Sequence, residues 1–229
     1  MNKQNILLLH GALGSASELS SLKEKLEDQF NVFSLDFSGH GKNTSDQSFE
    51  MSVFSNDIAL FMKEHNLEKT IIFGYSMGGY AALKFAQSHP EKVEKIITLG
   101  TKFNWSPEVA EAETKKLNPE KIEGKVPAFA QSLEKAHGKN WKDVVAKTAE
   151  MMHGLGNGKA FEMKDLAETR IETLLLLAEN DSMVSREETM VVLHTLPKAD
   201  FIIIPDSKHP FETVDKSKLV KIIQEFTLN

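Results

Sequence analysis

Short apolar runs alternate with longer amphipathic stretches along most of the chain. Continuous apolar runs are typical of parallel strands that are covered on both faces, and they predict strands at 6–9, 31–36, 70–73, 93–99, 171–177 and 200–204. Apolar residues at helical spacing predict helices at 17–30, 52–65, 80–88, 186–195 and 214–226. This alternation predicts an α/β fold with a sheet of about six strands, mostly parallel and flanked by helices.

One long segment lacks the strand pattern. Between residues 101 and 167, charged residues are dense and apolar residues recur at helical spacing. This predicts a helical cap, or lid, inserted into an α/β core made of residues 1–100 and 168–229. Residues 102–168 contain eleven lysines, eleven acidic residues and no arginine, so their formal net charge is zero. Since bidentate recognition of carboxylates and phosphates usually uses arginine, this composition disfavours highly anionic substrates.

Composition narrows the classes of partner and the compartment. The 229 residues include 27 Lys and Arg against 33 Asp and Glu, for a formal charge of −6. Nucleic acids and anionic membranes favour basic surfaces, so we expect neither as a partner. The absence of cysteine excludes disulfides, thiolate metal sites and a cysteine nucleophile. The first apolar run, 6–9, is too short for a signal peptide or a membrane span, and we expect a cytoplasmic monomer or homodimer.

The stretch Gly74-Tyr75-Ser76-Met77-Gly78-Gly79 joins a predicted strand to a predicted helix. A serine with glycine two residues before and two after it, in this context, has the G-x-S-x-G pattern of a nucleophile elbow. The turn is so tight that side chains at Gly74 and Gly78 would collide with neighbouring backbone. It exposes the Ser76 hydroxyl and points the Met77 N–H toward a developing oxyanion. A glycine-rich strand-to-helix turn or a weak phosphate loop is the structural alternative.

Two later loops carry the other groups that such a serine needs. A serine hydroxyl requires a base within hydrogen-bond reach, and the base requires an acid that fixes its tautomer. Asp181 follows the fifth predicted strand and His209 follows the sixth, so both lie at the carboxyl edge of the sheet with Ser76. Glu179 and Asp206 are weaker candidates for the acid. The histidines show no metal-binding spacing, so we expect no metal and no cofactor.

The order of Ser76, Asp181 and His209, with His10-Gly11 after the first strand, resembles the α/β-hydrolase superfamily of the small, cap-bearing type. The resemblance covers nearly the whole chain. It departs in the loop 36–41, where Ser38 stands in place of a proline, and in the histidine loop, which reads Ser-Lys-His-Pro-Phe where many members have Gly-His. The chain also begins at what would be the third of the usual eight strands, which again implies six.

The resemblance implies acyl transfer to water, with Ser76, His209 and Asp181 as nucleophile, base and orienting acid. The N–H groups of Ala12 and Met77 would bind the oxyanion, with Leu13 replacing Ala12 if the loop is shifted by one residue. A serine nucleophile disfavours the dehalogenase and epoxide-hydrolase branches, which need a carboxylate. We therefore expect a hydrolase of small or medium carboxylic esters.

The expected partner is a small ester-like substrate. Side chains that could line its pocket are apolar, although each is explained at least as well as cap core: Leu13, Phe103, Trp105, Met151, Met152, Met183 and Phe211. Other chemistries of the same triad stay open, namely hydrolysis of a carbon–carbon bond, a lyase reaction and cofactor-free perhydrolysis. A non-enzymatic receptor for a small molecule is an alternative of another class, because function depends on the site and not on the fold.

Overall fold

The computed structural model describes residues 3–228, so the predicted core residues 1, 2 and 229 lie outside the described residues. The six strands are β1 (Gln4–Leu9), β2 (Phe30–Leu35), β3 (Thr70–Tyr75), β4 (Val93–Leu99), β5 (Glu172–Ala178) and β6 (Ala199–Ile204). They form one sheet in the order β2-β1-β3-β4-β5-β6, and every neighbouring pair is parallel. The predicted six-stranded parallel sheet flanked by helices is confirmed.

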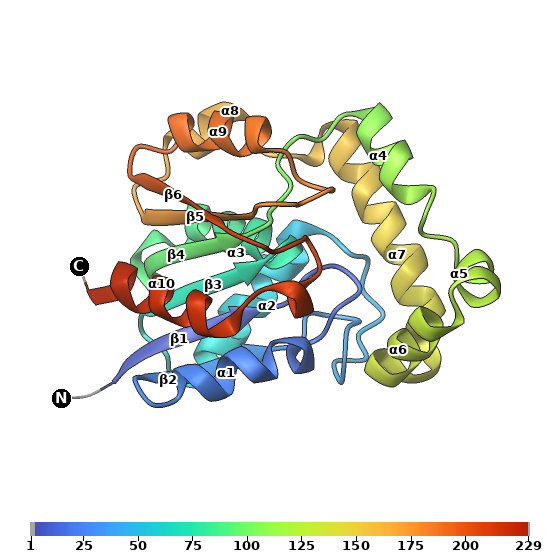
Figure 1. The fold of residues 1–229 in the computed structure, drawn as a ribbon, viewed down its shortest axis with the longest axis horizontal. Coiled ribbons are helices and arrows are strands. Elements are labelled where there is room, and N and C mark those ends of the chain that lie inside the picture. The colour runs from blue at the N-terminus through green and yellow to red at the C-terminus, as the bar shows by residue number, and fades with distance from the viewer. Residues whose placement is uncertain (1–2, 229) are drawn as a thin grey trace.

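Side chains of each strand alternate between two apolar cores, one on each face of the sheet. In β1, Leu7 and Leu9 point into one core, whereas Ile6 and Leu8 point into the other. The first core is closed by α2 (Met51–Glu64), α3 (Met77–Ser88) and α9 (Arg186–Thr195), and the second by α1 (Ser20–Leu26) and α10 (Lys216–Leu228). Both faces are therefore dry, which explains why the strands read as unbroken apolar runs. Figure 1 shows the sheet and the helices that cover its two faces.

The first helix is shorter than its predicted range of 17–30. A 3₁₀ turn at Ala16–Leu19 precedes α1, which ends at Leu26. Phe30 instead begins β2, where its side chain is 5% exposed and packs in the same core as Leu26. The apolar spacing that suggested one long helix therefore reflects a helix and a strand that bury their side chains together.

Five helices lie between β4 and β5: α4 (Pro107–Thr114), α5 (Pro119–Lys125), α6 (Pro127–His137), α7 (Trp141–Gly154) and α8 (Met163–Ala167). Proline begins α4, α5 and α6, where its missing N–H costs nothing, and Ser106 and Asn118 accept hydrogen bonds as N-caps of the first two. Helices α5, α6 and α7 share a small apolar core that includes Leu133 and Trp141. Figure 1 shows α4–α7 together beside the sheet, away from both chain termini.

Helix α8 differs from the four helices that precede it. Leu166 is 1% exposed and belongs to the core cluster that also contains Val192 of α9. In Figure 1, α8 lies against α9 on the face of the sheet and not with α4–α7. The last helix of the segment 101–167 therefore packs with the core layer. We call α4–α7 the helical insertion. Within residues 3–228, no helix is long and apolar enough to cross a membrane.

Candidate active site

Ser76 lies at the sharp turn between β3 and α3. Its backbone has φ 50° and ψ −114°, a positive-φ conformation that costs energy for any residue with a side chain. The turn is held from the neighbouring strand, because the Ser76 N–H donates to the Leu99 carbonyl over 2.8 Å. The Thr101 hydroxyl donates to the Ser76 carbonyl over 2.9 Å. The predicted strand–serine–helix junction is thus present, and its strain is maintained by contacts from the end of β4.

The glycines on either side of Ser76 fit the tight turn for steric reasons. A Cβ on Gly74 would lie 2.3 Å from the Gly79 nitrogen, and a Cβ on Gly78 would lie 2.4 Å from the Leu9 carbonyl oxygen. Both contacts are with backbone, which cannot move aside as a flexible side chain would. The spacing of glycines therefore reports the close approach of β1, β3 and α3 at this point.

His209 and Asp181 form a buried hydrogen-bonded pair. The His209 Nδ1 and Asp181 Oδ2 atoms are 2.8 Å apart, and the two side chains are 8% and 1% exposed. The other carboxylate oxygen accepts the N–H groups of Met183 and Val184 over 2.8 and 2.9 Å. Burial raises the pKa of Asp181, but the His209 ring and these two N–H groups outweigh it and hold the pKa below its usual range. Asp181 is thus a carboxylate that accepts Nδ1–H, which leaves Nε2 as the basic nitrogen of His209.

The two weaker acid candidates have other partners. A Glu179 carboxylate oxygen accepts the Asp206 N–H over 2.9 Å, and Asp206 has φ 57°, so the two residues shape the loop after β6. Neither carboxylate bonds to His209 among the residues that the structure describes. Gly100 lies against the chosen pair instead, because a Cβ there would be 3.2 Å from Asp181 Oδ2 and 3.3 Å from the His209 ring.

Ser76 and His209 line one pocket, which encloses about 460 Å³ including its opening to solvent. Within residues 3–228, no hydrogen bond links the Ser76 hydroxyl to His209. Such bonds are often long in the absence of substrate and tighten in the reacting complex. Ala12 and Met77 also line the pocket, and the rest of its wall is mostly apolar: Met51, Tyr80, Trp105, Met151, Met152, Leu155, Met183 and Val184.

Of the seven predicted substrate contacts, three are not on this wall and four line it: Trp105, Met151, Met152 and Met183. Phe211 is 1% exposed and packs against Phe73 and Tyr75 in the core, where the Tyr75 hydroxyl donates to the His209 carbonyl. Phe103 lines a separate hollow beside α8 and α9. Leu13 is partly buried against the apolar cores of the sheet and of the helical insertion. These three therefore support the site from behind.

The loop after β1, residues 10–15, is held by two buried histidines. His10 is fully buried; its Nε2 accepts the Phe37 N–H over 3.2 Å, so its Nδ1–H donates to the Gly11 carbonyl over 2.8 Å. Burial lowers the pKa of His10 to about 4, so the ring is neutral at pH 7. His137 of α6 accepts the Gly41 N–H at Nδ1 over 2.9 Å, and its Nε2–H therefore donates to the Leu13 carbonyl over 2.8 Å.

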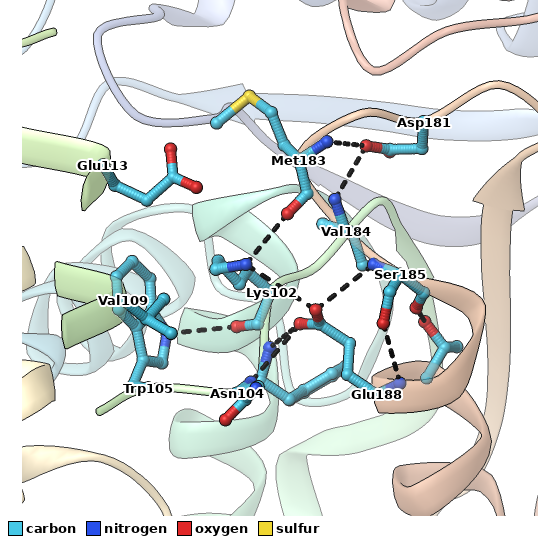
Figure 2. Close-up of polar contacts among 12 residues, drawn as sticks. Lys102, Asn104, Trp105, Val109, Glu113, Asp181, Met183, Val184, Ser185 and Glu188 are labelled. Carbon is cyan, nitrogen blue, oxygen red and sulfur yellow. Dashed lines mark hydrogen bonds and ion pairs between the residues drawn. The ribbon is translucent and has the colours of Figure 1, made fainter.

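A second polar network joins Asp181 to the start of the segment that leads into α4 (Figure 2). Lys102 donates to the Met183 carbonyl over 2.9 Å, and Met183 in turn donates its N–H to Asp181. Lys102 also pairs with Glu188 of α9 at 3.6 Å, in a site where the two side chains are 15% and 8% exposed. Glu188 accepts the N–H groups of Phe103 and Ser185 over 3.0 and 3.2 Å. The loop that holds Asp181 is therefore tied to the entry of the helical insertion.

Comparison with known proteins gives the family. A family model described as alpha/beta hydrolase fold matches residues 4–141, which is more than half of the chain. The chain belongs to the α/β-hydrolase fold family. Among curated relatives, it is 33% identical over 96 residues to an abhydrolase domain-containing protein of Schizosaccharomyces pombe and 24% identical over 98 residues to the esterase YbfF of Escherichia coli. These matches cover 41% and 43% of this α/β-hydrolase but only 36% and 39% of the two relatives.

Solved structures share the fold over the whole chain. An esterase from Thermogutta terrifontis superposes with a TM-score of 0.81 at 22% identity, over 99% of this chain and 90% of that one. A 2-hydroxy-6-oxo-6-phenylhexa-2,4-dienoate hydrolase from Rhodococcus superposes with a TM-score of 0.80 at 18% identity, over 99% and 91%. At these identities the likeness shows the fold alone. Residues 3–228 hold no cluster of three or more histidine, aspartate or glutamate side chains arranged to bind a metal.

Sequence analysis missed the residues that support this α/β-hydrolase site from a distance. His137, Lys102 and Glu188 carry no motif, and each contacts a loop far away in the sequence. The only signal in the sequence was the position of these residues relative to the ends of predicted strands and helices. A lysine three residues after a strand end and a histidine at the last position of a helix are common surface residues, so the contacts could be found only in three dimensions.

The buried carboxyl of Glu18 should make the stability of this α/β-hydrolase depend on pH. Its Oε2 atom is buried without a hydrogen-bond partner. Burial, then the charge of Glu212, raises the pKa of Glu18 to about 7, and the Gly11 backbone, His209 and Lys216 oppose this only in part. Because the folded pKa lies above that of the unfolded chain, the carboxyl stabilises the fold below about pH 4.5 relative to high pH, and this stability is lost as pH rises through about 7.

We therefore expect Glu18→Gln to raise the free energy of unfolding by roughly 2 kcal/mol at about pH 8, with a smaller gain at about pH 5. The measurement is the urea midpoint of both proteins across this pH range. Other titrating groups cancel in the difference between the two proteins. A gain that does not change with pH would contradict the explanation.

Proposed function

We propose that this α/β-hydrolase is a serine carboxylesterase that cleaves small or medium acyl esters by an acyl-enzyme mechanism. The observation that carries the proposal is one shared pocket. Ser76, strained at the elbow, and His209, whose Nδ1 lies 2.8 Å from Asp181, both line it. A serine, a histidine and a buried carboxylate that meet at the carboxyl edge of a parallel sheet have the chain order and setting of a catalytic triad.

In the proposed reaction, the Ser76 hydroxyl oxygen attacks the ester carbonyl while His209 Nε2 takes its proton. The tetrahedral intermediate collapses when the alcohol leaves with that proton, and the acyl group stays on Ser76. A water molecule then attacks the acyl-enzyme with His209 as base, and the acid product leaves as the serine proton returns. Asp181 keeps His209 in the Nδ1–H tautomer and stabilises the imidazolium that forms at each step.

Two backbone N–H groups are suited to bind the oxyanion. Met77 is the first residue of α3, and the N–H groups of a first helical turn have no intrahelical partner. The Ala12 N–H likewise donates to no group among residues 3–228, and both residues line the pocket beside Ser76. Aligned donors of this kind, near a helix N-terminus, stabilise negative charge that develops on the carbonyl oxygen. Leu13, the alternative donor, does not line the pocket.

The helical insertion would act as the cap that selects the substrate. Trp105 precedes α4 and Met151 and Met152 belong to α7, and all three line the pocket together with Met51, Met77 and Met183 of the core. Methionine is flexible and adapts to irregular apolar groups. Such a wall favours an acyl chain of moderate length over a rigid or strongly anionic group.

The proposal is tested by treating the protein with a neutral fluorophosphonate, which labels activated serines, and by assaying p-nitrophenyl esters of increasing acyl length. We expect one covalent adduct by intact mass, together with hydrolysis that is fastest for short or medium chains. A folded protein that forms no adduct and hydrolyses none of the esters would overturn the esterase proposal. Binding of a ligand without turnover would then favour the receptor alternative.

His137 offers a test of the oxyanion loop. Glutamine places its amide near the position of Nε2 and can keep the donation to Leu13, whereas asparagine reaches only the position of Nδ1 and keeps the bond from Gly41. We expect His137→Gln to retain kcat within about threefold and His137→Asn to lower it roughly tenfold, because a displaced donor stabilises the transition state poorly. Steady-state kinetics with one ester measure both values.

The control for His137→Gln and His137→Asn is the thermal unfolding of both variants. Each variant loses one buried hydrogen bond, so the two should be destabilised by similar amounts, about 1 kcal/mol. Equal kcat values in two variants of equal stability would show that His137 supports the fold and does not position the loop after β1.

A further inference from the structure

The wall of the active-site pocket contains two charged side chains, Lys102 and Glu113, in otherwise mostly apolar surroundings. Charges in such a place act strongly on a substrate, because the low dielectric of a covered pocket screens them little. The net electrostatic effect on a bound substrate depends on which of these two charges is already neutralised by other groups of the protein.

The Lys102 ammonium is committed to the protein. It donates to the Met183 carbonyl over 2.9 Å and pairs with Glu188, whose side chain is 8% exposed, at 3.6 Å. Its charge is therefore balanced within the protein by a buried carboxylate. Figure 2 shows both contacts on the side of Lys102 that faces the loop 181–188.

The Glu113 carboxylate has no such balance. Its side chain is 15% exposed, and within residues 3–228 its one ion pair is with Lys116 at 3.6 Å, from just beyond the end of α4. The Lys116 side chain is 73% exposed, and solvent screens a pair with such an exposed partner, so it contributes little. In Figure 2, Glu113 extends from α4 toward Met183 and Lys102, and no hydrogen bond or ion pair joins it to either.

We propose that Glu113 determines specificity and selects esters whose acyl chain carries a cationic ammonium group over those that carry a carboxylate. The inference rests on the proposed esterase function and deepens it. Attraction or repulsion by the Glu113 carboxylate acts on the charged end of the chain, whereas the ester group reacts at Ser76. A neutral chain of the same length packs against the apolar wall, and its kcat/KM does not depend on this charge.

The test uses three p-nitrophenyl esters of matched length, whose six-carbon acyl chains end in a methyl, a trimethylammonium or a carboxylate group. The quaternary amine cannot attack its own ester. We expect wild type to prefer the ammonium ester over the carboxylate ester in kcat/KM. In Glu113→Gln, which keeps the shape of the side chain, this preference falls roughly tenfold, while kcat/KM for the neutral ester changes by less than about twofold.

Glu111 supplies the matched control. It lies on the same helix and pairs with Lys115 at 4.0 Å, but its side chain is 59% exposed and does not line the pocket. Glu111→Gln changes the net charge by the same amount and should leave the preference unchanged. Glu113→Lys is the second variant, for which we expect the preference to reverse. Thermal unfolding confirms that each variant is folded.

The outcomes separate the two proposals. If the neutral ester is hydrolysed but neither Glu113 variant changes the preference, the inference is overturned and the esterase proposal stands. An equal change in Glu111→Gln would also overturn it, because a diffuse surface charge would then be the cause. If wild type hydrolyses none of the esters and forms no fluorophosphonate adduct, both proposals fall.

Discussion

Replacing Ser76 with alanine is expected to remove the fluorophosphonate adduct completely and to lower kcat for p-nitrophenyl esters roughly 10⁴-fold or more. The hydroxyl is the proposed nucleophile, and it is the only serine hydroxyl among the described residues that line the pocket. The substitution deletes one oxygen from a side chain that accepts and donates no hydrogen bond among the described residues. Stability should change little, and the affinity for a non-hydrolysable ester analogue should be kept.

The matched control is Ser132→Ala, on the exposed surface of α6, where the hydroxyl donates to the Phe129 carbonyl and to no other group within residues 3–228. We expect this variant to keep both the adduct and the wild-type kcat. Labelling that persists in Ser76→Ala would place the reactive nucleophile elsewhere. Loss of labelling with unchanged ester hydrolysis would mean that the esters react by a route that does not use the elbow.

Asp181→Asn should have the second largest effect, a fall in kcat of roughly 10³- to 10⁴-fold with KM changed only a few-fold. Asparagine can still accept the N–H groups of Met183 and Val184, so the loop should keep its shape. Its amide would donate to His209 Nδ1 instead of accepting from it. That contact stabilises the tautomer in which Nε2 carries the proton and cannot act as a base.

Glu179→Gln is the comparison for this variant, since it removes a carboxylate two residues away that bonds to the Asp206 N–H. We expect kcat within about threefold of wild type. Thermal unfolding of both variants accompanies the kinetics, because the buried pair also contributes to stability. A larger loss in Glu179→Gln than in Asp181→Asn would reverse the assignment of the acid.

The sheet could be predicted from sequence because its strands are buried on both faces and read as unbroken apolar runs. The elbow could be predicted because its strand, glycines and helix are contiguous in the sequence, although one of its glycines, Gly78, is required by the backbone of β1. Asp181 and His209 were identified by their position after strands of one parallel sheet. The structure does place these two side chains within hydrogen-bond distance.

The pocket wall could not be predicted in the same way. Phe211 follows the histidine closely in sequence, yet it points into the core beneath Tyr75, since the chain turns after Pro210. Glu113 is an ordinary helix residue by sequence, and it reaches the pocket only because of how α4 and α7 pack. Helix spacing predicts that a face is buried, but it does not predict whether that face covers a core or a cavity.

The methionines of the pocket have a consequence for oxidative damage. Five of the nine methionines in the chain line this one cavity: Met51, Met77, Met151, Met152 and Met183. Oxidation by peroxide converts a thioether into a sulfoxide, which is polar, chiral and larger. Each such event would place a strong dipole on a wall that otherwise accepts an apolar chain. The chain has no cysteine to react first, so its methionines are the most readily oxidised side chains, and five of the nine are concentrated at the candidate active site.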